Sequence, residues 1–196
     1  AAVRRSLLET LASLTPDNRV PLRPDPATVY RAVPDPAAAD FFRNQAGRAV
    51  SILASKRIPF QPASGSRMAL IGQDGDFLRA AQSIWPKAET LRYGNEPFFR
   101  AEAATIAQAQ ALAQRSDWIL FCLANPNSRD VLAALRPWRD RILVVSTLTP
   151  VYLEDLPWVE TAVAVYGQTK DSYRFGLAAL QGAYPAPGSL PVRTRP

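Results

Sequence analysis

The stretch "DWILFCLANPNSRDVLAALRPWRDRILVVST", residues 117–147, decides the fold class. It begins and ends with runs that are almost wholly apolar, over residues 117–124 and 141–147, and both runs predict strands buried on two faces. Between them, residues 127–138 have the pattern of a helix, and Asn125-Pro126-Asn127 predicts a turn with Asn127 as the helix N-cap. A strand, a helix and a second buried strand in this order indicate a parallel α/β unit.

The same alternation continues on both sides of this stretch. Further strands are predicted over residues 67–72, 89–94 and 161–167, and further helices over 74–85, 97–115 and 169–182. An earlier helix is predicted to begin at Asp35-Pro36, to end near Ser55 and to carry an apolar stripe of Phe42, Ala46, Ala49, Val50 and Leu53. We therefore expect a three-layer α/β/α sandwich over residues 35–196, with a mostly parallel sheet of about five or six strands. The Pro-rich residues 1–34 are interpreted as a linker or arm from a preceding domain.

The composition excludes several kinds of chemistry. There is no His among the 196 residues, so Ser-His-Asp and Cys-His catalysis and His-based metal sites are excluded. The one Cys, Cys122, can form neither an internal disulfide nor a thiolate metal site, and its apolar surroundings predict a buried strand residue. No acidic spacing typical of a calcium loop occurs, and we expect no metal and no cofactor.

The charge of the chain does not indicate a particular partner. The net charge is +6, but the 23 basic residues are scattered, with "RPWRDR" at 136–141 as the one cluster. Nucleic-acid binding requires clustered basic residues, so we expect neither a nucleic-acid partner nor, without a long apolar run, a membrane span.

The candidate site lies where the predicted parallel strands end, because ligands of such sheets bind outside the carboxyl ends of the strands. The candidate substrate-binding residues are Asp74, Asp76, Asn125 and Asn127. Each also has a structural interpretation: Asp74 and Asp76 as helix caps and the two Asn residues as parts of a turn. The stretch "GQDGDF" (72–77) lacks the third Gly of a dinucleotide-binding loop, and its two acidic residues would repel phosphate. We identify no catalytic residue.

Two stretches resemble the C-terminal α/β sandwich domain of glycoside hydrolase family 3. The first is "GAYPAPGSLPV" (182–192), in which Gly182, Gly188, Leu190, Pro191 and Val192 match the helix end and the Gly-x-Leu-Pro-Val segment of that family. The second, "NQAGRAVSILASKRIPFQP" (44–62), is similar to the helix and following segment that precede the family's first sheet strand. In the first stretch, Gly182 is predicted to end a helix in the left-handed conformation, and Leu190 and Val192 to bury apolar surface.

The resemblance implies a retaining β-glycosidase whose nucleophilic Asp lies in an N-terminal (β/α)₈ barrel of about 250 residues. Its β-glucosidase-like branch takes a Glu acid/base from a loop of this domain, whereas its β-N-acetylglucosaminidase branch uses an Asp-His pair on the barrel beside a Lys-His-x-Pro-Gly motif. The comparable loop here, "LANPNSRDVLAALRP", has no Glu, which favours the second branch.

The resemblance thus implies an accessory domain that is inactive alone, with the barrel and a carbohydrate as its partners. A free-standing module for a small polar ligand or sugar is the alternative, and a complete enzyme using carboxylates and Tyr is a third. The compartment stays open, although relatives that act on external glycans are often exported or periplasmic.

Overall fold

The computed structural model describes residues 26–27 and 36–190. The chain divides into two compact units, residues 1–40 and 41–196, and the second contains the sheet. The interpretation of residues 1–34 as a linker lies almost entirely outside the described residues and stays a prediction. Among the described helices, none is long and apolar enough to cross a membrane.

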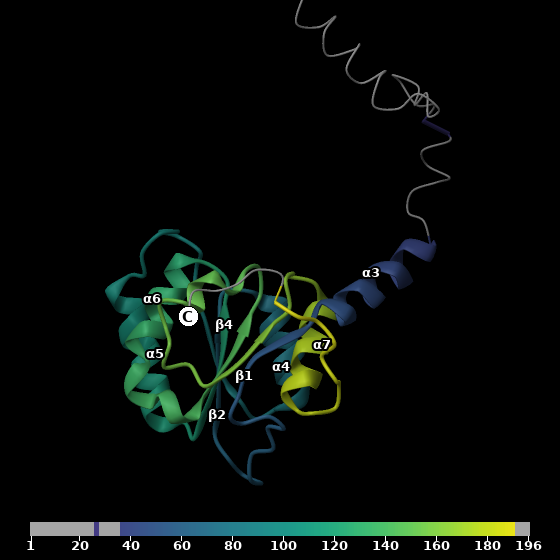
Figure 1. Cartoon of the computed structure of the whole chain (residues 1–196). Helices are drawn as coiled ribbons and strands as arrows, with labels where there is room; N and C mark the ends of the chain where they lie inside the picture. Colours follow the sequence, from purple (N-terminus) through teal and green to yellow (C-terminus); the bar gives the residue numbers. More distant parts are fainter. Residues whose placement is uncertain (1–25, 28–35, 191–196) are drawn as a thin grey trace, which may run out of the picture. The chain divides into compact units, whose positions relative to one another are not determined.

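One sheet of six strands forms the middle layer, in the order β1–β6–β5–β4–β2–β3 (Figure 1). Five neighbouring strands pair in parallel: β2 (Met68–Gly72), β3 (Glu89–Arg92), β4 (Trp118–Leu123), β5 (Ile142–Ser146) and β6 (Thr161–Ala164). The edge strand β1 (Ser51–Ser55) pairs antiparallel with β6. The predicted α/β class and mostly parallel sheet are confirmed.

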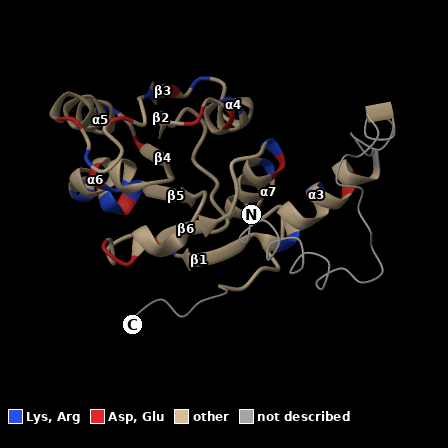
Figure 2. Ribbon diagram, turned by 90° about the horizontal axis from the view of Figure 1, so that it is seen from above, with Lys and Arg blue, Asp and Glu red and all other residues tan. Residues whose placement is uncertain are grey.

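Helices cover both faces of the sheet. Viewed from above, α4 (Gly75–Ile84) and α7 (Lys170–Leu180) lie on one side, and α5 (Ala103–Arg115) and α6 (Pro126–Ala134) lie on the other (Figure 2). The remaining helical segments are α3 (Pro36–Ala49) and the short 3₁₀ helices η1 (Arg136–Arg141) and η2 (Pro150–Leu153).

The strand register explains the continuous apolar runs. Leu70, Leu120 and Leu143 are aligned across β2, β4 and β5, and all three belong to the core beneath α4 and α7. Their neighbours Ile119 and Ile142 are also aligned, and they belong to the core beneath α5 and α6. Because successive side chains point to opposite faces, a strand covered on both sides must be apolar at every position.

The structure corrects two predicted element boundaries. The helix expected to end near Ser55 ends at Ala49, and residues 51–55 form β1 instead. Pairing with β6 determines this, since Ser51 lies opposite Ala164 and becomes buried. The helix predicted over 97–115 begins at Ala103, and the preceding residues form a loop containing Pro97.

The end of the described chain follows the predicted Gly and Pro pattern. Gly182 has φ +74 and ends α7, and its amide donates to the Ala179 carbonyl at 3.0 Å. Gly188 donates to the Val50 carbonyl at 2.8 Å, and a Cβ there would lie 2.4 Å from the Ala49 oxygen. Leu190 is half-buried and lines a groove of about 430 Å³ beside Leu53. Pro191 and Val192 lie outside the described residues.

Candidate functional site

The sheet order defines one place where a ligand site is expected. The chain passes from β2 to β3 on one side and then crosses to β4 on the other side. At such a switch point the loops after the two central strands diverge and leave a crevice outside their carboxyl ends. Residues 73–76 follow β2 and residues 124–127 follow β4, so all four sequence-predicted site residues lie at this switch point.

Three buried amide side chains form a hydrogen-bonded network there. Asn125 Nδ2 donates to Gln73 Oε1 at 2.8 Å, and Gln73 Nε2 donates to Asn127 Oδ1 at 3.2 Å. Gln73 Nε2 also donates to the Gly94 carbonyl at 3.1 Å. Because a buried amide without partners is costly, this mutual pairing stabilises the loops after β2 and β4 against each other.

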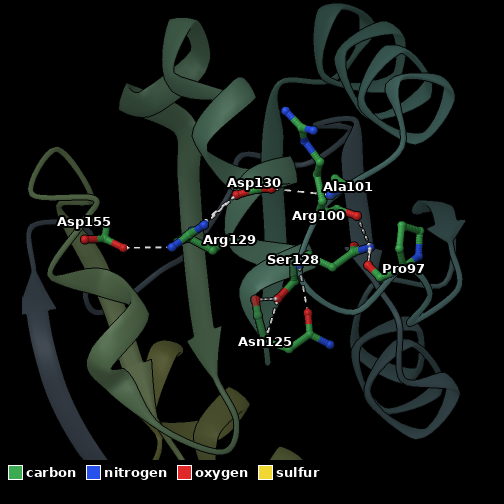
Figure 3. A network of polar contacts seen from close by, with 9 residues as sticks. Pro97, Arg100, Ala101, Asn125, Ser128, Arg129, Asp130 and Asp155 are labelled. Carbon is green, nitrogen blue, oxygen red and sulfur yellow. Dashed lines mark hydrogen bonds and ion pairs between the residues drawn. The ribbon is translucent and has the colours of Figure 1, made fainter.

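The network also holds the loop between β3 and α5, defined here as the edge loop (residues 94–101). Asn127 Nδ2 donates to the carbonyls of Pro97, at 2.8 Å, and Arg100, at 3.1 Å, and the Asn127 amide donates to the Phe98 carbonyl at 3.0 Å. Figure 3 shows Pro97, Arg100 and Ala101 above the beginning of α6. The backbone of the edge loop is therefore held at several points by Asn127, together with the contact of Gln73 with Gly94.

Arg129 and Asp130, in the next turn of α6, add a hydrogen bond and two ion pairs to these contacts. Asp130 accepts from the Ala101 amide at 3.4 Å and pairs with Arg129 at 2.9 Å, and Arg129 also pairs with Asp155 at 3.1 Å (Figure 3). These ion pairs raise the pKa of Arg129, chiefly through its hydrogen bond with Asp130. Arg129 thereby connects α6 to the turn after η2.

Asn125, and not Asn127, is the N-cap of α6, which corrects the sequence prediction. Its side chain accepts from the Ser128 amide at 2.9 Å, and the Ser128 hydroxyl lies 2.9 Å from the Asn125 amide, completing a capping box. Pro126 occupies the first helical turn, where its missing N–H costs nothing. Asn127 is consequently free to bind the edge loop.

Asp74 acts as the predicted helix cap. It is the N-cap of α4, and its Oδ1 accepts from the Asp76 amide at 2.7 Å. Its other oxygen accepts from the Tyr173 hydroxyl at 2.6 Å, and burial, followed by this bond, raises the pKa of Tyr173. Asp76 forms an ion pair with Arg79 within α4. Whether Asp74, Asp76, Asn125 and Asn127 contact a ligand stays a prediction, but the polar contacts described here satisfy much of their hydrogen-bonding capacity.

Exposed apolar side chains are the feature of this edge that the sequence interpretation missed. Phe98 and Phe99 lie on the edge loop with their rings 4.9 Å apart, and Phe99 is 77% exposed. Leu148, on the loop after β5, and Val151, in η2, are exposed at the same edge of the sheet. The sequence signal for this feature is "PFFR" (97–100), where the helix expected from residue 97 would contain a Pro and two adjacent aromatic residues.

Tyr93 and Cys122 are two further titratable side chains near the site whose pKa values are affected by burial. Tyr93 follows β3, and its hydroxyl is buried without a hydrogen-bond partner in the described structure. Cys122 is buried within β4, as the sequence predicts, and burial raises the pKa of both Cys122 and Tyr93. The part of the chain that the structure describes has no group of three or more Cys, Asp or Glu side chains suited to a metal ion.

Comparison with solved structures shows a shared fold. A glycoside hydrolase family 3 β-N-acetylglucosaminidase from Paenibacillus sp. str. FPU-7 aligns with a TM-score of 0.68 and 16% identity, over 81% of this chain and 33% of that protein. A fungal multi-domain β-N-acetylglucosaminidase of the same family aligns with a TM-score of 0.62 and 17% identity, over 79% and 19%. A β-glucosidase from Listeria innocua aligns with a TM-score of 0.61 and 11% identity, over 79% and 26%.

The chain thus has the fold of one part of much longer glycosidases, since it spans about a third or less of each of these three proteins. No protein-family profile matches the sequence, and no curated protein sequence matches it.

Proposed function

We propose that this chain is the C-terminal accessory domain of a family 3 glycoside hydrolase. The parent enzyme would remove terminal β-linked N-acetylglucosamine, or a related β-glycoside, with retention of configuration. Its nucleophile would lie on an N-terminal (β/α)₈ barrel, which would be the partner of this domain. The chain itself contributes a surface to that partner and no catalytic group.

The proposal rests on one observation: the structural matches cover most of this chain but only a small part of each matching protein. The alignment with the Paenibacillus enzyme covers 81% of this chain but only 33% of that enzyme. A fold repeated as one part of longer glycosidases is expected to depend on the rest of such a protein for its chemistry. The sequence resemblance at residues 44–62 and 182–192 is independent support.

The surface we assign to the barrel is the carboxyl-terminal edge of the sheet. Phe98, Phe99, Leu148 and Val151 expose apolar area there. Exposed apolar groups gathered at one edge are typical of a surface that another domain covers. Asn127 holds the edge loop from beneath, so the two Phe side chains would meet the partner without first having to be ordered.

Three acidic groups at this edge have structural partners. Asp74 caps α4 and accepts from Tyr173, and Asp130 and Asp155 are both paired with Arg129. Retaining hydrolysis needs two carboxyl groups about 5 Å apart, one of them free to attack the sugar. We therefore expect the isolated chain to hydrolyse no glycoside.

The β-N-acetylglucosaminidase branch is favoured by the loop after β4. The resemblance places the acid/base Glu of the β-glucosidase-like branch in this loop, where the present chain has Asn125 and Asn127. Both Asn side chains are engaged in holding the loops together. An acid/base on the barrel is the remaining arrangement within the family.

The test uses this chain and the coding sequence that precedes Ala1, expressed as separate polypeptides. We expect a one-to-one complex by analytical ultracentrifugation, broken by Phe99→Asp and retained by Phe99→Leu, which keeps an apolar side chain. Only the polypeptide that precedes Ala1 should carry the nucleophile. A folded upstream polypeptide that does not bind, or glycosidase turnover by the isolated chain, would overturn the proposal, and the latter would favour a complete enzyme.

A further inference from the structure

A second hollow lies at the opposite, amino-terminal edge of the sheet. It is a cleft of about 720 Å³, bounded by the loop before β2 (residues 62–67), by the segment after α4 (85–89) and by the end of α5. Its lining comes from chain segments far apart in sequence, which the sheet brings together. None of the sequence-predicted site residues lines it.

Two ion pairs supply polar groups to this cleft: Glu89 and Arg115 both line it, whereas of the second pair only Arg67 lines it and Asp117 lies outside the lining. Arg115 Nε donates to Glu89 Oε2 at 2.9 Å, and Arg115 Nη2 donates to Glu89 Oε1. Arg67 donates to Asp117 from Nη2 at 2.7 Å, from Nε at 3.2 Å and from its backbone amide at 2.8 Å. Arg115 Nη1 also donates to the Ala111 carbonyl at 2.9 Å, and each carboxylate keeps lone pairs beyond those used in its ion pair.

The carboxylates of these pairs stay ionised at neutral pH. The Arg115 guanidinium lowers the pKa of Glu89, and hydrogen bonds from Arg67 lower the pKa of Asp117 to about 2. The cleft therefore offers strong acceptors and strong donors side by side, with their charges largely offset.

The cleft also has an apolar part to its lining. Trp85 lines the cleft, is half-buried and packs edge-on against Phe60 at 6.0 Å between ring centroids. Ile84 and Met68 also contribute to the lining. Because the buried Phe60 packs against it, the Trp85 indole is a held and partly exposed apolar group in the same cleft as Glu89 and Arg115.

This lining discriminates between classes of ligand. An anion would need unpaired cations, but among the described lining residues Lys87 is the one cation without a carboxylate partner. A purely apolar ligand would leave the donors and acceptors of both ion pairs without compensation. A neutral ring with an apolar face and several hydroxyl groups satisfies both parts of the lining.

We propose that this cleft binds a neutral sugar ring, with Trp85 against its apolar face and with Glu89 and Arg115 bonded to its hydroxyl groups. The site is defined by its own lining and does not depend on the parent being a hydrolase. A sugar chain would enter past Ser64 and Gly65, where the loop is open: a Cβ on Gly65 would have no atom within 4 Å.

The test is a titration of this chain with N-acetylglucosamine, followed in ¹H–¹⁵N spectra. The four Trp residues give separate indole signals, and we expect the Trp85 signal and the amides of Gly65 and Glu89 to shift. Glu89→Gln keeps the size of this exposed side chain and should weaken binding about tenfold, the effect of losing one charge-assisted hydrogen bond. Glu102→Gln, at the other end of α5, is the matched control and should bind as the unmodified chain does.

Three results would overturn the proposal. The first is the absence of shifts at a large excess of sugar in a folded sample. The second is equal affinity of Glu89→Gln and Glu102→Gln. The third is saturation of the same signals by inorganic phosphate at lower concentration than by the sugar, which would make this an anion site.

Discussion

The carboxylate of Asp74 links α4 to α7 through a hydrogen bond from the Tyr173 hydroxyl. It caps α4 and accepts from Tyr173, a buried residue of α7 whose ring also packs against Phe77 at 5.6 Å. Tyr173→Phe would remove that donor and leave the rest of the side chain in place. We expect a loss of about 1.5–3 kcal/mol in the free energy of unfolding, measured with urea.

Tyr152→Phe is the control for this experiment. Tyr152 is half-buried, and the described structure shows no hydrogen bond from its hydroxyl, so its substitution should change stability little. Equal stabilities of the two variants would show that the Tyr173–Asp74 contact contributes nothing.

The ion pair of Arg67 and Asp117 predicts a dependence of stability on pH. Hydrogen bonds from Arg67 lower the pKa of Asp117 from 3.8 to about 2 in the folded chain. A lowered folded-state pKa gives stability that is present above pH 4 and is lost as the pH falls towards 2. Asp117→Asn should therefore lower the urea midpoint at neutral pH and flatten its decline between about pH 4 and pH 2.

Asp140→Asn is the comparison, because Asp140 is exposed at the same edge and its side chain has no ion pair among the described residues. A decline equally steep in Asp117→Asn and in the unmodified chain would contradict this account.

Single residues were predictable where the local sequence alone decides their role. Asp74 was identified as a cap because a polar side chain between a strand and a helix has one nearby partner. The role of Asn127 was not predictable, since its partners Pro97 and Arg100 are about thirty residues away in sequence. Local spacing favours Asn127 as the cap, whereas the structure has Asn125 in that role and Asn127 in contact with the edge loop.

At the scale of elements, Asn127 links α6 to the edge loop. Asn127→Ala would remove the donor to the Pro97 and Arg100 carbonyls and the acceptor for Gln73. We expect a loss of about 1–3 kcal/mol in the free energy of unfolding, because buried polar groups lose their partners. Amide hydrogen exchange over residues 94–101 should become faster, as mass spectrometry would detect.

Asn95→Ala, on the exposed part of the same loop, should leave both quantities close to those of the unmodified chain. If exchange over residues 94–101 is the same in both variants, Asn127 does not hold the edge loop.

The contact of Gly188 with β1 gives a second prediction at this scale. A Cβ at Gly188 would lie 2.4 Å from the Ala49 oxygen and 2.7 Å from the Ser51 hydroxyl, so backbone would have to move. We expect Gly188→Ala to lower the free energy of unfolding by about 1–3 kcal/mol. Gly94→Ala is the control, because its nearest contact would be 3.9 Å away, and equal thermal midpoints would refute the close approach.

Most elements were predictable from apolar periodicity, and the exception has a physical reason. Residues 51–55 continue an apolar stripe with helical spacing, so the sequence favours a helix there. The open edge of β6 provides backbone hydrogen bonds to this segment, and pairing with β6 outweighs the local preference. The local sequence pattern contains no information about a pairing strand that lies about a hundred residues away.

At the scale of the whole molecule, the alternation of strands and helices predicts a parallel sheet but not its order. The order places β2 beside β4, and this brings Gln73, which follows β2, to Asn125 and Asn127, which follow β4. Four candidate residues could thus be predicted at one edge, whereas their mutual contacts and the exposed Phe98 and Phe99 could not. The resemblance at the two ends of the domain is to a family whose members share this fold among the solved structures.

The reading frame upstream of Ala1 in the source gene distinguishes an accessory domain from a free-standing module. We expect there a stretch of about 250 residues with the pattern of a (β/α)₈ barrel, including a Lys-His-x-Pro-Gly motif and a later Asp nucleophile. A start codon immediately before Ala1 would contradict the proposed function, because the chain would then have no catalytic half and would be a free-standing ligand-binding module.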